Sequence, residues 1–355
     1  MHDWYIYKGD NKKRSLKADE LPPPPPWRNF DGEIISERKL RTDTRTESRG
    51  ETFMADPEMI EAVNMALYLR RPLLVTGKPG SGKSSLACSV AWELGLGSVL
   101  HWPVTTRSNL LEGQYQYDAL GRLQELQIDK YLRDMGKAAE GKDNCDLLKF
   151  SPESIGRYIR LGPLGTALLP SEIPRVLLID EIDKSDIDLP NDLLNVFEEG
   201  EFVIPELARM AEVCKEIPVL PCDPADKEDR VIIREGKVKC RAFPFILMTS
   251  NGERELPAPF LRRCLRLDIR QPGEEKLAKI VAAHFKDANP ELLKSRTELI
   301  QTFLKRQKEG ELATDQLLNA VYLRTKNIDL NAGVSEDKES LIRSVFRYLD
   351  RMENE

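Results

Sequence analysis

The strongest constraint on the fold is one glycine-rich octapeptide, Gly77-Lys78-Pro79-Gly80-Ser81-Gly82-Lys83-Ser84. It fits the pattern G-x-x-x-x-G-K-[ST], in which glycines let the backbone curl so that several N–H groups point inward at bound phosphates. The apolar run Leu73-Leu74-Val75 precedes it, and apolar residues at helical spacing follow from Leu86 to Leu94. A buried strand, a phosphate loop and a helix in this order predict one half of a βαβ unit.

Each predicted contact of this loop follows from residue chemistry. Lys83 is expected to reach the β- and γ-phosphates as a point charge, and Ser84 is expected to give its hydroxyl to Mg²⁺. The helix that begins near Lys83 adds its positive end. The predicted nucleotide-binding residues are Gly77, Pro79, Gly80, Ser81, Gly82, Lys83, Ser84 and Ser85.

A second apolar run, Val176 to Ile179, ends in the two carboxylates of Asp180 and Glu181. A parallel strand delivers such residues to the carboxyl edge of the sheet, where ligands bind in doubly wound folds. We expect Asp180 to hold Mg²⁺, directly or through water, and Glu181 to act as general base on the attacking water.

Two further polar groups follow apolar runs. Phe245 to Met248 leads into Thr249-Ser250-Asn251, and we expect Asn251 to bridge the γ-phosphate and the attacking water, with a helix or turn cap as the alternative. The adjacent Arg262 and Arg263 precede another strand. An arginine supplied across a subunit boundary can stabilise transition-state charge, whereas the alternative is an ordinary surface pair.

Short apolar runs separated by helical patterns predict an α/β fold, with a mostly parallel five-stranded sheet flanked by helices. The predicted strands lie near residues 73–75, 98–104, 175–179, 243–249 and 265–269. Beyond Pro272 the pattern is helical only, which predicts a small all-helical lid domain with helices over 274–285, 291–306, 314–324 and 338–352. The expected domains are therefore 1–54, 55–271 and 272–355.

Residues 1–54 are expected to form an extended, proline-rich arm, because five consecutive prolines precede Trp27 and a polar stretch follows. The arm is either a docking segment anchored by Trp27 or a linker laid over its own domain.

The net charge of −6 disfavours a general nucleic-acid coat protein. The six cysteines are scattered without a CxxC pair, which disfavours a zinc site or a disulfide framework. No apolar run approaches the roughly 20 residues of a membrane span, and the N-terminus lacks a signal peptide's apolar core. A cytoplasmic protein without membrane contact is expected.

Taken together, these motifs resemble an AAA+ ATPase in order and spacing, with Walker A at Gly77–Ser84, Walker B at Leu177–Glu181, sensor 1 at Asn251 and the arginine pair after it. More narrowly, the chain looks like the MoxR branch of the helix-2-insert group, which also holds dynein-related and McrB-like modules. The stretches that carry this are Leu161–Gly165, Asn191–Gly200 and Val231–Val238. The resemblance covers roughly residues 55–325.

The resemblance implies a homo-oligomeric ring, usually a hexamer, with ATP and Mg²⁺ bound between subunits. It also implies chaperone-like remodelling of partner proteins, often beside a von Willebrand A-domain protein. By the family pattern Arg263 aligns best with the arginine finger, and Arg262 is the second choice.

The chain departs from the family pattern in three places. It carries insertions at about 117–171 and 202–230, and Leu207 to Ile217 in the second favours a small helix. The lid stretch Glu311 to Gln316 contains no sensor 2 arginine, so either this residue is missing or another, such as Arg324, replaces it.

Three functions remain open at this point: a protein-remodelling ATPase ring, a nucleic-acid motor or restriction or defence subunit, and a nucleotide-gated scaffold with little turnover. A predicted hairpin before Asn251 bears on the second. Its basic residues alternate with apolar ones, which suits either a nucleic-acid backbone or a solvated face. They are Arg230, Arg234, Lys237, Lys239 and Arg241.

Overall fold

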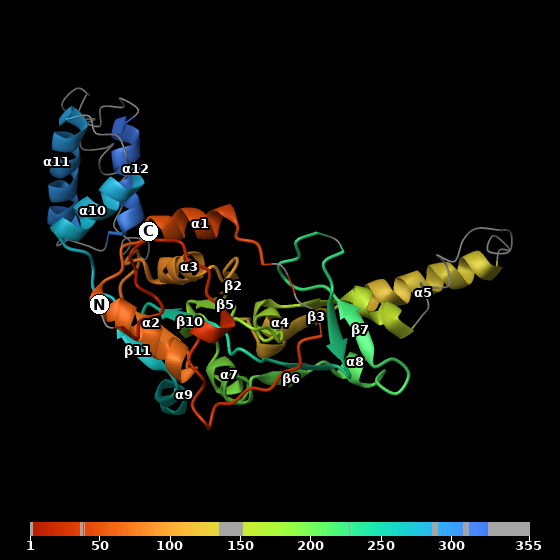
Figure 1. The fold of residues 1–355 in the computed structure, drawn as a ribbon. Helices are drawn as coiled ribbons and strands as arrows, with labels where there is room; N and C mark the ends of the chain where they lie inside the picture. The colour runs from red at the N-terminus through yellow and green to blue at the C-terminus, as the bar shows by residue number, and fades with distance from the viewer. Residues whose placement is uncertain are drawn as a thin grey trace.

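A five-stranded sheet forms the centre of the computed structural model, which describes residues 3–35, 38, 40–134, 152–226, 228–285, 290–307 and 312–325 (Figure 1). Its order is β11-β1-β10-β5-β2, and all neighbours are parallel. The strands are β1 (Leu73–Thr76), β2 (Leu100–Pro103), β5 (Val176–Asp180), β10 (Phe245–Ser250) and β11 (Leu265–Asp268). The predicted α/β fold with five strands is confirmed.

Helices cover both faces of this sheet. Leu73 and Val75 share one core with α2 (Pro57–Leu69) and α3 (Lys83–Leu94). Leu74 belongs to the other core. The helices that contribute to it include α6 (Pro163–Ala167), α7 (Asp188–Glu199) and α9 (Ala258–Arg263). Because successive strand residues point to opposite faces, the central strands read as continuous apolar runs.

The predicted hairpin belongs to a second, antiparallel sheet of order β6-β9-β8-β7. Its strands are β6 (Glu201–Val203), β7 (Glu216–Val219), β8 (Val231–Arg234) and β9 (Lys237–Lys239). The expected helix over residues 207–217 is wrong. Only α8 (Pro205–Ala208) is helical, and Ile217 is buried in β7 opposite Ile233. This long-range pairing overrides the local helical preference.

After α4 (Leu110–Gln114), near the start of the insertion predicted at about 117–171, β3 (Tyr115–Tyr117) forms a short antiparallel pair with β4 (Ile159–Leu161). Between them lie α5 (Ala119–Asp134) and a 3-10 helix, Pro152–Tyr158. Figure 1 shows α5 projecting away from the body, on the side opposite the C-terminal helices. Residues 135–151 lie outside the described part.

Three of the four predicted C-terminal helices are present as α10 (Glu274–His284), α11 (Pro290–Gln307) and α12 (Thr314–Thr325). They share a hydrophobic core of their own, which includes Leu277, Phe303 and Leu317. The helix expected over 338–352 lies outside the described residues. None of the described helices has the length and apolar character needed to cross a bilayer.

The N-terminal arm lies on the body of its own chain. Tyr7 is fully buried, and its hydroxyl shares a 2.7 Å hydrogen bond with Ser89 of α3. Asn64 of α2 accepts from the backbone N–H groups of Ile6 and Tyr7 and donates to the Tyr7 carbonyl. Trp27 is 78% exposed and therefore does not hold the arm on this surface.

The arm also contains a 3-10 turn, Ala18–Glu20, and one helix, α1 (Thr44–Glu51), which begins at the N-cap residue Asp43. The Asp43 carboxylate accepts from the Thr46 backbone N–H at 2.7 Å, which satisfies one of the free donors of the first turn.

Candidate functional site

The glycine-rich loop connects β1 to α3 through backbone conformations that favour glycine. Gly77, Gly80 and Gly82 have φ of 146°, 71° and 90°. A Cβ on Gly77 would lie 2.4 Å from the Ile269 carbonyl oxygen, and one on Gly80 would lie 2.4 Å from the Ala313 Cβ. The loop is therefore held between the end of β11 and the start of the lid helix α12.

Lys83 brings a positive charge into this loop. Its Nζ donates to the carbonyls of Gly77 and Lys78, at 2.5 and 3.0 Å, and to Asn251 Oδ1 at 2.7 Å. The buried Ser81 hydroxyl has no hydrogen-bond partner among the described residues. A bound phosphate oxygen would satisfy that hydroxyl, so the loop's donors fit the predicted ligand.

Asp180 receives three hydrogen bonds at the end of β5. Ser84 and Thr249 donate to Oδ1 at 2.9 and 2.6 Å, and His101 Nε2 lies 3.2 Å from Oδ2. Burial raises the pKa of Asp180, but the hydrogen bonds from His101, Thr249 and Ser84 outweigh it and lower the pKa to about 2. The carboxylate is therefore ionised at neutral pH.

The Ser84 hydroxyl and the Asp180 carboxylate form a pair of hard oxygen ligands that suits Mg²⁺. Within the described part of the chain, no group of three or more His, Cys, Asp or Glu side chains is arranged to hold a metal ion. A divalent ion at Ser84 and Asp180 would therefore need further ligands from phosphate and water, as Mg²⁺ ordinarily takes them.

Glu181 begins a 3-10 turn, Ile182–Lys184, and has a left-handed backbone with φ 60° and ψ 51°. Its N–H donates to Thr249 Oγ1 at 2.8 Å. Lys184 Nζ lies 2.8 Å from its carboxylate, and Asn251 Nδ2 lies 3.4 Å from Oε1. The turn thus aims Glu181 away from the strand direction and toward the loop after β10.

The buried Asp183 fixes the loop that carries Asn251. Its Oδ2 accepts from the backbone N–H groups of Asn251 and Glu253, at 2.9 and 3.0 Å. Asn251 lies between Lys83 and Glu181 because β10 lies between β1 and β5 in the sheet. The strand order therefore explains how residues far apart in sequence meet.

These side chains line one cavity of about 530 Å³, a size ordinary for small-molecule sites. The predicted residues at its wall are Pro79 to Ser85, Asp180, Glu181 and Asn251. The arm contributes Arg49 and Phe53, and the lid contributes Lys276, His284 and Thr314. The arm and the lid thus close the site around the phosphate loop.

The predicted arginine pair lies elsewhere, at the end of α9. Neither Arg262 nor Arg263 is among the described residues that line the cavity. Arg263 Nε donates to Glu198 Oε1 at 2.9 Å, and the other oxygen of Glu198 receives Arg28 NH1 at 3.1 Å. Arg262 is exposed and makes no ion pair with any described residue.

The lid approaches the cavity with the first turn of α12, through Thr314, Asp315 and Leu318. Arg324 is near the other end of α12 and its side chain is outside the described part, so its replacement of the missing lid arginine stays a prediction.

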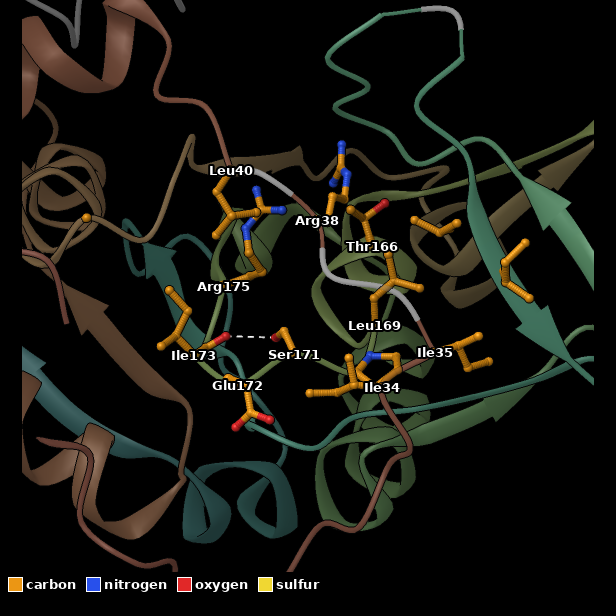
Figure 2. Close-up of a pocket in the computed structure, with 14 residues that line it drawn as sticks. Ile34, Ile35, Arg38, Leu40, Thr166, Leu169, Ser171, Glu172, Ile173 and Arg175 are labelled. Carbon is orange, nitrogen blue, oxygen red and sulfur yellow. Dashed lines mark hydrogen bonds between the residues drawn. The ribbon is translucent and has the colours of Figure 1, made fainter. Parts of the chain in front are cut away.

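A second cavity of about 320 Å³ lies between the arm, the segment 166–175 and β8 (Figure 2). Its wall is largely apolar, and its two arginines are engaged. Arg38 binds Asp223 and Asp229, each at 2.7 Å, and Arg175 binds Asp223 at 2.7 Å. The two ion pairs of Arg38 join the arm to the second insertion, and the Arg175 ion pair joins that insertion to the segment before β5.

The basic residues of the hairpin are largely neutralised by acids. Arg234 pairs with Glu33 and Glu216, whereas Lys237 pairs with Glu201. Lys239 binds Asp31 and Glu201, and Arg241 binds Glu172 at 3.7 Å. Arg230 instead donates weakly to the Gly156 carbonyl. This surface therefore offers little unbalanced positive charge to a nucleic-acid backbone.

Sequence reasoning missed several residues of the site. Thr249 follows a predicted strand two residues before Asn251, so its place at the strand end was available as a signal. His101 reaches Asp180 because β2 pairs with β5. Local sequence patterns do not predict the order of strands in a sheet, so this contact could not be predicted. Arg49 had no local signal, since it arrives through the packing of the arm.

No protein-family model matches the chain, and no curated protein matches it. Among solved structures, the chain is similar to that of C. elegans PCH-2, with 13% sequence identity and a TM-score of 0.39. The match covers 87% of this chain and 76% of that chain. A likeness of this size bears on neither the site nor the activity.

Proposed function

We propose that this chain is an ATPase of the AAA+ superfamily that binds ATP with Mg²⁺ and hydrolyses it to ADP and phosphate. One observation carries the proposal. The Lys83 ammonium, the Ser84–Asp180 oxygen pair, the Glu181 carboxylate and the Asn251 amide line a single cavity at the carboxyl edge of the parallel sheet.

Each residue has a role that its chemistry supports. Lys83 and the loop amides hold the phosphates, while Ser84 and Asp180 hold Mg²⁺, which neutralises phosphate charge when bound. Glu181 accepts the proton of the attacking water, and Asn251 orients that water between Glu181 and the γ-phosphate. In this structure Lys184 forms an ion pair with the Glu181 carboxylate, so that pair must open before both carboxylate oxygens are free to accept from the attacking water.

At a finer level we propose that the chain forms a ring of MoxR type, most simply a hexamer. We propose that this ring remodels a partner protein, and a von Willebrand A-domain protein is the first candidate. The exposed apolar side chains of α5, Leu120, Leu123, Leu126, Ile128 and Tyr131, support a protein partner. The neutralised hairpin disfavours nucleic acid. The location of Arg262 and Arg263 outside the cavity fits action on a neighbouring subunit's site.

The test compares ATP turnover of the wild type with Lys83→Ala and Glu181→Gln, after each variant is shown to keep the wild-type circular dichroism. We expect Lys83→Ala to lose ATP binding, and Glu181→Gln to retain binding but lose turnover. Light scattering in the presence of ATP measures the molar mass of the assembly and so tests whether a ring forms. Equal hydrolysis by wild type and Glu181→Gln overturns the role of Glu181, and absence of ATP binding by the wild type overturns the proposal.

A nucleotide-gated scaffold with little turnover is the second candidate. It is favoured by the ion pair that holds Glu181 and by the absence of an arginine between Leu312 and Gln316 at the start of α12. It predicts that the wild type binds ATP and forms its assembly but hydrolyses no faster than Glu181→Gln.

A further inference from the structure

One positive charge in the nucleotide cavity has no assigned role. Among the described residues that line the cavity, those with lysine or arginine side chains are Arg49, Lys83 and Lys276. Lys83 is bound to Asn251 and to loop carbonyls, and Lys276 forms an ion pair with Asp56. Arg49 has no hydrogen bond or ion pair with any residue in the described part of the chain, although it faces the phosphate loop's cavity.

The arm helix α1 places Arg49 there by packing along α3. Near its start, Asp43 N–H donates to Ser98 Oγ at 2.9 Å, and Thr46 Oγ1 accepts from Val99 N–H at 3.2 Å. These contacts lie beyond the C-terminal end of α3. Near its other end, Gly50 lies against Cys88 in the middle of α3. The arm helix therefore runs antiparallel to α3 and toward the phosphate loop.

The close approach of the two helices fixes the position of α1 on the surface of α3. A Cβ on Gly50 would lie 2.5 Å from the Trp92 Cβ and 2.7 Å from the Cys88 carbonyl oxygen, so the backbones are closer than any larger residue allows. One turn later, the Phe53 ring lies 3.4 Å from the position of a Cβ on Gly82. Arg49 thus lies between two fixed contacts of the arm, and it lines the same cavity as Ser84 and Ser85.

We propose that Arg49 binds a phosphate group of the nucleotide held in the same subunit, and that it supplies from the arm the charge that the start of the lid helix α12 lacks. The inference rests on the proposed nucleotide-binding function and assigns a further residue to that site. A guanidinium stays ionised throughout the physiological range and presents a planar fork that matches phosphate oxygens. If Arg49 binds the phosphate, nucleotide binding would also stabilise the contact of the arm with α3.

The test is the dissociation constant for ATP and for ADP, measured by isothermal titration on the full chain. We expect Arg49→Ala to weaken ATP binding about tenfold, the lower end for a hydrogen bond to a charged group, because Arg49 is exposed. Arg49→Gln removes the charge but keeps a polar, shorter side chain, and we expect the same loss. Arg45→Ala is the matched control, since Arg45 lies one turn earlier on α1 and is not among the described lining residues.

A loss for both nucleotides places Arg49 on the α- or β-phosphate, and a loss for ATP alone places it on the γ-phosphate. Unchanged affinities for both nucleotides in a folded Arg49→Gln variant overturn the inference, as does an equal loss in Arg45→Ala. Lys83→Ala separates this failure from failure of the proposed function. If the wild type binds ATP and Lys83→Ala does not, the site itself stands whatever Arg49 does.

Discussion

Replacing Gly50 with alanine tests the packing of α1 on α3, because two physical effects predict opposite signs. In an open helix, alanine is more favourable than glycine by about 1 kcal/mol. Here the added methyl group would lie 2.5 Å from the Trp92 Cβ and 2.7 Å from the Cys88 carbonyl oxygen. Neither atom moves by a change of rotamer, so overpacking costs about 2–3 kcal/mol. The expected net effect is a loss of stability of about 1–2 kcal/mol.

Urea unfolding followed by circular dichroism measures this loss as a lower midpoint with an unchanged slope. Gly273→Ala is the control for the added methyl group, because no atom lies within 4 Å of its added Cβ; since Gly273 is the N-cap residue of α10, its loss should be about 1 kcal/mol or less. A Gly50→Ala protein that is more stable than the wild type would refute the close approach of the two helices.

Three further predictions concern the arm and the arginine pair. Asn64→Ala removes the bonds that hold two arm amides and an arm carbonyl, so it should cost about 3 kcal/mol and speed proteolysis of the arm, whereas a protected arm would contradict this. Arg263→Ala should abolish hydrolysis. Adding Glu181→Gln subunits, which keep Arg263, should partly restore it if Arg263 acts on the site of a neighbouring subunit, and mixing that never restores activity would contradict that role. The hydrogen bond from Arg38 holds the pKa of Asp229 below its usual 3.8, so this pair stabilises the fold above about pH 4 and loses that effect as the pH falls further. The stability difference between wild type and Asp229→Asn should therefore shrink on acidification from about pH 5, and a constant difference would contradict the assignment.

Local sequence pattern was enough to predict the elements of the site but not all of their neighbours. The three central strands, β1, β5 and β10, are apolar runs buried on both faces, so their positions could be predicted directly from the sequence. The glycine loop and Asp180 come at the ends of such runs. The residues that pattern missed reach the site through long-range packing. His101 depends on strand order, and Arg49 depends on how a distant arm lies on α3.

The second insertion is another case in which long-range pairing decides the structure. Leu207 to Ile217 has a helical composition, yet Glu216 and Ile217 pair with Arg234 and Ile233 in a sheet. Burial of Ile217 against β8 decides this structure, and a window of neighbouring residues contains no information on that partner.

The left-handed backbone at Glu181 has a consequence for protein engineering. A residue with a Cβ at φ 60° is less stable there than glycine, and asparagine also tolerates this conformation better than glutamate. A redesign of this chain guided by folding free energy alone would therefore replace Glu181 and remove the proposed general base. A thermostabilised variant of this protein needs position 181 held fixed, even though its backbone marks it as a place for improvement.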